Sequence, residues 1–385
     1  MQFSLPLTML IVFGSAKVIS DLLERVGLPG IAGEILAGIL IGPSVMNWVA
    51  PNETIRALSD LGVLFLLFSI GLDVQLADLL RVGLLSTLVA TLGEAVPFLA
   101  GWGILLAWGG TAHAALFLGA ALVATSVGIS ASVLKRWDLL RHPASQIILA
   151  AAVIDDVLGL IVLAVVSSVA RGRFNLAEIV VTAGLATTFV VVTAIWGTRV
   201  VSRLFPHFHS RIRADEAQFQ VAMVLLFSLA VLAFYAGVAA IVGAFLAGLA
   251  LADSADSRVR NLTRGVTELL VPFFLAGIGL NFDVGIFRSR STVLMALVIL
   301  LAAIATKVIG CGLATLSVGW QTSLRVGLGM IPRGEVAMVA AQLGLSMLML
   351  SAAVYSVIVF VVVASALLTP PLLKVAFGRA VHQAP

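Results

Sequence analysis

The amino-acid sequence predicts an all-α, polytopic membrane protein with about thirteen transmembrane helices, inverted-topology repeats and two discontinuous helices that cross. Composition is the first indication: 61% of the 385 residues are hydrophobic and only 11% are charged, whereas soluble domains are about 25% charged. The mean hydropathy is +1.15. Apolar segments of membrane-spanning length recur along the whole chain, and two of its sequence patterns occur twice.

An apolar segment of about 17–25 residues can cross the hydrocarbon core as a helix. We place thirteen such segments near residues 5–24, 29–45, 57–73, 82–107, 112–134, 143–170, 176–200, 217–236, 238–252, 266–281, 291–317, 325–345 and 352–369. The connections are too short for a soluble domain, so we expect no nucleotide-binding regulatory domain. The first run lacks a basic start and a small-residue cleavage site, so we expect a mature span there.

Lysine and arginine in the short loops indicate the orientation, because cytoplasmic loops carry an excess of them. With thirteen alternating spans, sixteen basic residues lie on one side: Lys17, Arg25, Arg81, Lys135, Arg136, Arg141, Arg199, Arg203, Arg211, Arg213, Arg258, Arg260, Arg264, Arg325, Lys374 and Arg379. The other side has five: Arg56, Arg171, Arg173, Arg288 and Arg290. We therefore expect a cytoplasmic C-terminus and an N-terminus outside. The basic residues form no face that could follow nucleic acid, so no nucleic-acid partner is expected.

An internal repeat relates the two halves of the chain. The pattern from Gly27 to Gly38 aligns with Gly237 to Gly248 at an offset of 210 residues. Phe65 to Asp73 aligns with Phe273 to Asn281 at an offset of 208. An odd number of crossings separates the copies, so they face opposite ways. Inverted repeats are typical of secondary transporters, although small-residue membrane helices also resemble one another by chance.

Two spans are predicted to be broken near mid-depth. Pro332, within Val326–Glu335, removes a backbone donor and clashes with the preceding helical turn. Its equivalent in the first repeat contains Thr125, Ser126 and Gly128. The exposed ends of half-helices carry partial charges, and in transporters such ends contact the ions.

The segment Ala150–Val166 carries two adjacent aspartates, Asp155 and Asp156, in an otherwise apolar run. One aspartate at the centre of a membrane helix costs about 2.5–3.5 kcal/mol, so the pair indicates an ion site. A buried helix of a soluble protein is the alternative, but ionised carboxylates are rare in such cores unless they are paired.

Lys307 lies near the middle of the 291–317 span and needs a partner. Successive helix residues diverge by about 100°, so the two aspartates cannot share one partner equally. We expect one aspartate to face Lys307 and the other to face a permeating cation, for which a proton can compete at a carboxylate. Lys307 could also neutralise the negative C-terminal ends of the half-helices.

At these positions the chain resembles the bacterial sodium/proton antiporters of the monovalent cation:proton antiporter superfamily, of the NapA type. The resemblance is carried by Ala121–Ser130, Ala151–Val165, Pro332–Val336 and Lys307. It implies an NhaA/NapA-like fold in a homodimer that transports by an elevator-like movement. The implied dimerisation domain comprises residues 1–81 and 211–287, the ion-carrying core domain residues 82–170 and 288–385, and the linking helix residues 171–210.

The resemblance also assigns site residues. Asp156 corresponds to the ion-binding aspartate and Asp155 to the aspartate paired with the lysine. Thr125 and Ser126 lie at the helix crossing near the ion. Pro332, Arg333 and Glu335 are expected to support the core, where an internal arginine–carboxylate pair is an equal alternative. The Asp–Asp pair with lysine resembles electrogenic members, which exchange two protons for each sodium ion.

The expected function is exchange of sodium, or lithium, for protons across the bacterial inner membrane, with a role in pH homeostasis and no cofactor. A potassium/proton antiporter of the same fold is the alternative, because sequence spacing does not reveal cavity size. An intramembrane aspartyl protease would need two carboxylates converging on one water, and adjacent helix residues diverge. A sodium-coupled organic-anion symporter is disfavoured by the Asp–Asp pair with lysine. We therefore expect a transporter and no enzyme.

Overall fold

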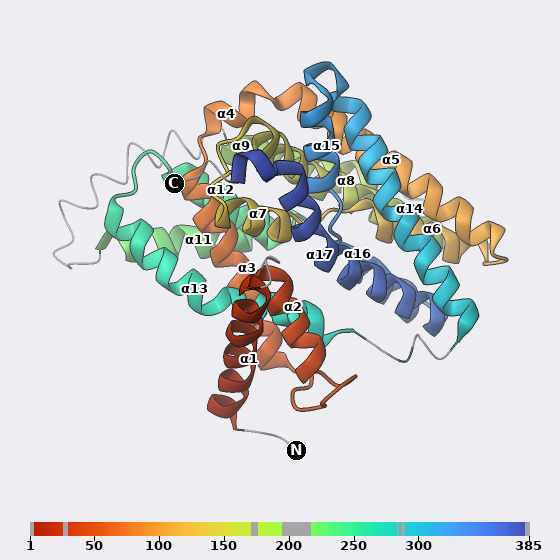
Figure 1. The fold of residues 1–385 in the computed structure, drawn as a ribbon. Helices are drawn as coiled ribbons and strands as arrows, with labels where there is room; N and C mark the ends of the chain where they lie inside the picture. Colours follow the sequence, from red (N-terminus) through yellow and green to blue (C-terminus); the bar gives the residue numbers. More distant parts are fainter. Residues whose placement is uncertain are drawn as a thin grey trace.

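The computed structural model describes residues 4–25, 30–170, 176–194, 217–282, 285 and 289–381, and no β-strand occurs in these ranges (Figure 1). Within them, nine helical segments are long and apolar enough to cross a membrane. Eight are single helices: α1 (Leu5–Arg25), α3 (Glu53–Asp73), α5 (Gly83–Ala107), α8 (Pro143–Ala170), α11 (Ala217–Tyr235), α13 (Ser257–Leu280), α14 (Arg290–Thr315) and α17 (Ala352–Val381). The ninth consists of α6 (Ala112–Val123) and α7 (Val127–Arg136).

Shorter helices occupy the remaining predicted spans: α2 (Gly30–Ile41), α9 (Leu176–Val192), α12 (Ala240–Leu251), and the pair α15 (Trp320–Gly329) and α16 (Glu335–Ser346). A further short helix, α4 (Leu76–Arg81), connects α3 to α5. Every one of the thirteen predicted segments therefore contains a helix. The end of the 176–200 segment lies outside the described residues.

Two helices extend well beyond their predicted ends. Helix α13 begins at Ser257 rather than near 266, because the Asp256 side chain caps it by accepting a hydrogen bond from Val259 N at 2.8 Å. Its first turns are rich in arginine, so their hydropathy is too low to indicate a membrane span. Helix α17 continues through Pro370 and Pro371 to Val381. Beyond the prolines its buried Phe377 packs in the largest apolar cluster, which stabilises the extension.

The helices pack as two groups (Figure 1). The first helix group contains α1, α2, α3, α11, α12 and α13, in which α3 packs against α12 and α13 and α2 packs against α1 and α13. The second helix group contains α5, α6, α7, α8, α14, α15, α16 and α17. There α5 packs against α6, α8 and α14, and α16 packs against α6 and α17.

The repeated glycines form matching contacts within the first helix group. Gly38 of α2 packs against the α13 backbone beside Gly279, and Gly248 of α12 packs against the α3 backbone beside Gly71. A Cβ atom on any of the four would collide with the facing backbone. Because Gly38 aligns with Gly248 and Gly71 with Gly279, each copy of the repeat contributes one helix to each of two equivalent contacts.

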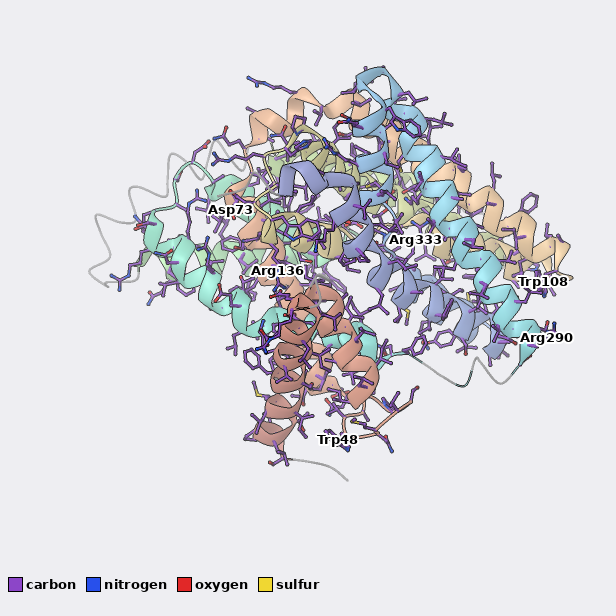
Figure 2. All side chains as sticks on the ribbon, in the orientation of Figure 1. Trp48, Asp73, Trp108, Arg136, Arg290 and Arg333 are labelled. Atoms are coloured by element: carbon purple, nitrogen blue, oxygen red, sulfur yellow. The ribbon has the colours of Figure 1, made fainter. Side chains whose placement is uncertain are left out.

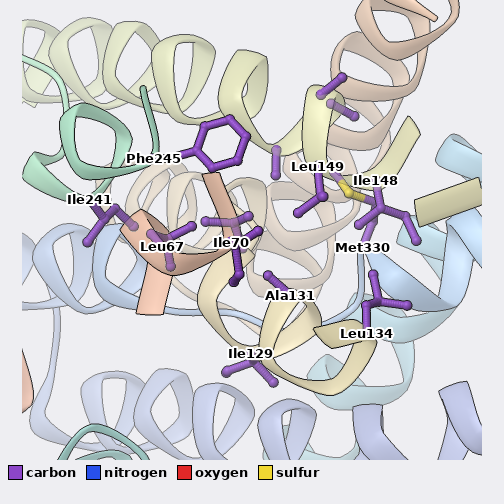
Figure 3. Packing of buried hydrophobic residues seen from close by; sticks show 14 of the residues in the cluster. Leu67, Ile70, Ile129, Ala131, Leu134, Ile148, Leu149, Ile241, Phe245 and Met330 are labelled. Carbon is purple, nitrogen blue, oxygen red and sulfur yellow. The ribbon is translucent and has the colours of Figure 1, made fainter. Parts of the chain in front are cut away.

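The surface between the two groups is apolar (Figure 3). Leu67 and Ile70 of α3 lie in the same buried cluster as Ile129 of α7 and Leu149 of α8. Phe245 of α12 also joins this cluster. Hydrophobic side chains therefore form a continuous part of the contact between the two groups.

Candidate ion-binding site

Two interrupted helices cross at the centre of the second helix group. Helix α6 ends at Val123 and α7 begins at Val127, while α15 ends at Gly329 and α16 begins at Glu335. The breaks bind each other directly: Ser126 N donates to Pro332 O at 2.7 Å, and Thr125 Oγ1 donates to Met330 O at 3.3 Å. Both breaks lie where the sequence predicts them, and each exposes helix ends with partial charges of opposite sign.

The crossing is close because Gly334 has no side chain. A Cβ atom on Gly334 would lie 2.7 Å from Ser126 Cβ and 2.8 Å from Ser126 Oγ. Ser130 Oγ adds a hydrogen bond to Gly329 O at 2.5 Å, one turn further into α7. Unwound backbone is tolerated inside a membrane protein only where such partners satisfy it.

Asp155 ties this crossing to Lys307. Its Oδ2 accepts a hydrogen bond from Thr125 N at 2.6 Å, and its Oδ1 accepts one from Lys307 Nζ at 3.2 Å. Both charged side chains are fully buried, with 0% of their surface exposed. The carboxylate therefore satisfies a backbone donor freed by the α6–α7 break and also compensates a cation in the middle of α14.

Asp156 lies next to Asp155 on α8 and is also buried, with 2% of its surface exposed. Because successive helix residues are about 100° apart, its carboxylate points in a different direction from that of Asp155. The two aspartates of the sequence pair thus have different surroundings. One is held by Thr125 and Lys307, whereas the other is not part of that bonded pair.

Arg333 is completely buried at the second break. Its backbone N–H donates to Ser365 Oγ at 3.1 Å, and its Nη2 donates to Ala303 O at 3.2 Å. Ala303 lies one turn before Lys307 on α14. No carboxylate lies within ion-pair distance of Arg333 among the described side chains. The side chain of Glu335 is not among them, so the arginine–carboxylate pair stays a prediction.

Glu94 on α5 is a further buried carboxyl group near these charges, and the sequence predicts no partner for it. It is 6% exposed and interacts electrostatically with Asp155, Lys307 and Asp156. The only sequence signal is an acidic residue inside an apolar span. That signal does not reveal which helix the side chain faces.

A cavity of about 900 Å³ leads to the crossing from the side on which α3 begins. It is lined by Asn52, Arg56 and Asp60 from α3 and its start, and by Ser126 and Arg333 from the two breaks. The cavity lies between the two helix groups. In Figure 2, Arg333 lies well inside the second helix group, far from Trp108 and Arg290 at its outer end.

Ion pairs connect the two helix groups at the opposite end. Lys135 of α7 lies 3.3 Å from Asp73 of α3. Within the first helix group, Arg260 of α13 lies 3.2 Å from the same carboxylate. Arg136 also pairs with Glu24 of α1. The helix crossing is therefore reached by a cavity from one face, while charged side chains join the groups at the other face.

Comparison with known proteins agrees with this architecture. Residues 9–376 match the family described as "Sodium/hydrogen exchanger, transmembrane". The chain is 32% identical to the "Na(+)/H(+)-K(+) antiporter GerN" of Bacillus cereus, over 98% of this chain and 97% of that protein. It is 31% identical to the "High-affinity Na(+)/H(+) antiporter NhaS3" of Synechocystis, over 98% and 91%.

Solved structures have the same fold. The electron-microscopy structure of the sodium proton antiporter MjNhaP1 from Methanocaldococcus jannaschii superposes with a TM-score of 0.74 at 17% identity, over 98% of this chain and 97% of that one. The relatives are named as antiporters, which are transporters rather than enzymes. The crossing of two broken helices, the buried charges beside it and these matches lead to one conclusion: the chain belongs to the sodium/hydrogen exchanger family of multi-pass membrane antiporters.

Proposed function

We propose that this protein exchanges sodium for protons across the bacterial inner membrane, and that Asp156 with Asp155 forms the transport site. The observation that carries the proposal is the buried Asp155–Lys307 pair beside Asp156 at the crossing of two broken helices. Thr125 and Ser126 support the site from the first break. Pro332 and Arg333 support it from the second.

In this proposal the two aspartates have different roles at the site. Asp155 is already occupied by Lys307 Nζ and Thr125 N, so its contacts hold the site together. Asp156 is the carboxylate outside that pair, where a sodium ion or a proton is bound in turn. Because the site is partly dry, a sodium ion and a proton cannot bind there together: the second positive charge would not be compensated.

The two helix groups support an elevator-type movement. In this proposal, the second helix group is the core domain (residues 82–170 and 288–385). The first is the dimerisation domain (residues 1–81 and 211–287), and residues 171–210 link the two. Much of the surface between them is apolar, so one group can slide against the other once the ion pairs that join them break. Lys307 and Asp155 both belong to the second helix group, so they travel together.

The structure supports an outward-facing state under the orientation indicated by the basic residues. The cavity opens on the side where α3 begins, which is the outer side in that orientation. The Lys135–Asp73 and Arg136–Glu24 pairs then lie at the cytoplasmic side. These pairs stabilise the outward-facing state and must break before the site reaches the cytoplasm.

A homodimer formed by the first helix group completes the proposal. In the most apolar 18-residue stretch of α1 only 17% is buried within the chain, and in that of α11 only 22%. These helices therefore offer broad apolar surfaces to lipid or to a second copy. Cross-linking of the protein in native membranes tests this assembly. A monomer under these conditions would contradict it.

The experiment for the proposed function uses the purified protein in liposomes with an imposed pH gradient. Addition of sodium or lithium should dissipate the gradient, and Asp156→Asn should abolish that response. Because a relative is named as a Na⁺/H⁺–K⁺ antiporter, potassium is the second candidate substrate. A response to potassium alone would favour the second candidate, and no response to any alkali cation would refute antiport.

We also propose that transport is electrogenic, with more than one proton exchanged for each sodium ion. Asp156 releases one proton, and Lys307 releases another when its pair with Asp155 opens on sodium binding. The reversal potential in the same liposomes tests this. If more than one proton exchanges for each sodium ion, the sodium gradient at zero net flux shifts with the membrane voltage. A reversal point independent of voltage would establish electroneutral exchange and contradict this part of the proposal.

The outward-facing state is tested with Asp73→Asn, which removes the carboxylate shared by Lys135 and Arg260. Ser59 lines the cavity, so a cysteine placed there should react with an impermeant thiol reagent added outside. Labelling should fall in the Asp73→Asn background, because the inward-facing state becomes more populated. Asp21→Asn, which affects only an exposed pair with Arg25, is the matched control. Equal labelling in all three backgrounds would exclude a role for this ion pair.

A further inference from the structure

A second cavity, which we call the basic pocket, lies where Lys135 of α7 meets α3 and the start of α13. In the orientation indicated by the basic residues, this is the cytoplasmic side. The pocket has a volume of about 150 Å³, several times the roughly 30 Å³ that one water takes up in the liquid. Its lining residues are mostly polar or charged: Ser69, Leu72, Asp73, Lys135, Ser257, Arg260, Asn261 and Arg264.

The charges that line the basic pocket do not balance. Three lining side chains are basic and one is acidic, which leaves a formal charge of +2; they are Lys135, Arg260, Arg264 and Asp73. Lys135 interacts electrostatically with both arginines as well as with Asp73, so the three cations are close enough to repel one another. Asp256 precedes α13 but does not line the pocket, and its side chain accepts from Val259 N. A compact group with two negative charges would cancel the excess.

Arg260 is held in a fixed position at this pocket. Its Nη2 donates to Ala252 O at 2.6 Å, and its Nη1 donates to Leu72 O and, at 3.2 Å, to Asp73 Oδ1. A guanidinium has five N–H donors, so these three bonds leave donors for a ligand. Because the side chain is already ordered, binding an anion costs little further conformational entropy.

Arg264 lies one turn beyond Arg260 and on the same face of α13. It is exposed, and its side chain forms no hydrogen bond or ion pair with another described residue. Ser257, in the first turn of α13, lies on this face as well. The N-terminus of a helix carries a partial positive charge, which adds to the attraction for an anion.

We propose that the basic pocket binds a phosphate group, from a soluble phosphate or from a lipid headgroup, between Lys135, Arg260 and Arg264. A phosphate dianion matches the formal charge of +2, and its oxygens accept hydrogen bonds from both guanidinium groups and from the ammonium group. This site goes beyond the proposed function, which gives the pocket no ligand.

The bound phosphate would also join the two helix groups. Lys135 belongs to the second helix group, whereas both arginines belong to the first. An anion held by all three side chains strengthens the contact that the Lys135–Asp73 pair makes at this end. It therefore stabilises the outward-facing state and slows exchange. This second part of the inference rests on the proposed function.

The first test measures binding of ³³P-labelled inorganic phosphate to the purified protein in a neutral detergent at constant ionic strength. Arg264→Gln should weaken binding at least about tenfold, equivalent to about 1.4 kcal/mol. Arg264 is exposed, so this variant should fold. Arg258→Gln is the matched control, because it removes one arginine from the same end of α13 outside the pocket lining. Its affinity should stay within about twofold of wild type.

A second arm distinguishes the source of the phosphate. Phosphatidic acid in phosphatidylcholine nanodiscs is detected on the protein by native mass spectrometry. Retention of this lipid by wild type and its loss in Arg264→Gln, without binding of inorganic phosphate, would identify a lipid headgroup. The opposite pattern would identify a soluble phosphate. Binding of neither, or equal binding by wild type and Arg264→Gln, would overturn the inference.

The effect on the state is measured in liposomes with Ser59→Cys and an impermeant thiol reagent added outside. Phosphate enclosed in the liposomes, or phosphatidic acid in their membrane, reaches the cytoplasmic face of the molecules that the reagent labels. The ligand that binds should raise labelling and slow sodium-driven proton flux, and both effects should disappear when Arg264→Gln is added.

Unchanged labelling at saturating ligand would overturn the coupling between this pocket and the transport state. The binding measurements need no ion gradient, so they separate this inference from the proposed function. Wild type that binds phosphate but shows no sodium-driven proton flux would refute antiport and support the site. Wild type with normal flux that binds neither ligand would overturn the site alone.

Discussion

Replacing Lys307 by alanine should destabilise the protein strongly, because it leaves Asp155 ionised and unmatched in a dry environment. The two charged atoms are 3.2 Å apart and both side chains are 0% exposed. At an effective dielectric constant of about 20, this separation corresponds to about 5 kcal/mol of attraction. Removing one partner of a buried pair typically costs about 3–5 kcal/mol, which agrees with that value.

A double-mutant cycle separates the pair from other effects of the substitution. Asp155→Asn keeps a side-chain oxygen for Thr125 N and removes the charge that needs Lys307. The double variant Asp155→Asn, Lys307→Ala should therefore be destabilised by at least about 2 kcal/mol less than the sum of the single variants.

Thermal unfolding in one detergent at one scan rate provides the measurement, because irreversible unfolding depends on the rate of heating. Lys307→Ala should lower the apparent Tm by on the order of 5–10 °C. Asp155→Asn should lower it less. A Tm for Lys307→Ala within about 1 °C of wild type, or single effects that simply add, would refute the account of the pair.

Three other variants test separate parts of the structure. Asp156→Asn should fold normally and show no sodium-driven proton flux in liposomes. Ser130→Ala removes the hydrogen bond to Gly329 O and should lower the free energy of unfolding by about 1 kcal/mol, seen as a small fall in Tm. Burial and then the charge of Arg325 lower the pKa of His142 from 6.5, so the folded protein binds this proton less readily than the unfolded chain. Stability from this residue is present above pH about 6.5 and lost as the pH falls, and His142→Gln should reduce that loss in Tm measured at several pH values.

A specific result would contradict each of these three predictions. Residual exchange in Asp156→Asn would move the transported ion to another carboxylate. A Ser130→Ala protein as stable as wild type would show that the α7 contact at the crossing contributes nothing. An unchanged acid dependence of Tm in His142→Gln would mean that other groups determine it.

The positions of the membrane helices could be predicted from the sequence because they follow directly from hydropathy. The breaks could be predicted too, since Pro332 cannot continue a helix and the repeat transfers the same feature to Thr125. The start of α13 and the end of α17 could not be predicted from the sequence. The start of α13 is charged, and the end of α17 passes two prolines because its far turns pack against buried neighbours.

The candidate site was predictable in part. The depth of Asp155 and of Lys307 in their spans indicates that each needs a partner, and the structure brings the two together. Glu94 could not be interpreted in this way, because its meaning depends on which face of α5 meets α8 and α14. Likewise, no sequence pattern shows that Arg333 donates to the carbonyl of Ala303, four residues before Lys307. Contacts between distant helices depend on packing, which hydropathy does not specify.

The central claim is that sodium and protons compete for one buried acidic site around Asp156. The most direct test is the equilibrium affinity of the purified protein for sodium, measured across the pH range from acidic to alkaline. The account predicts that affinity falls steadily as the solution becomes more acidic, and that Asp156→Asn removes both the binding and its pH dependence. Sodium binding of equal strength at every pH would contradict it.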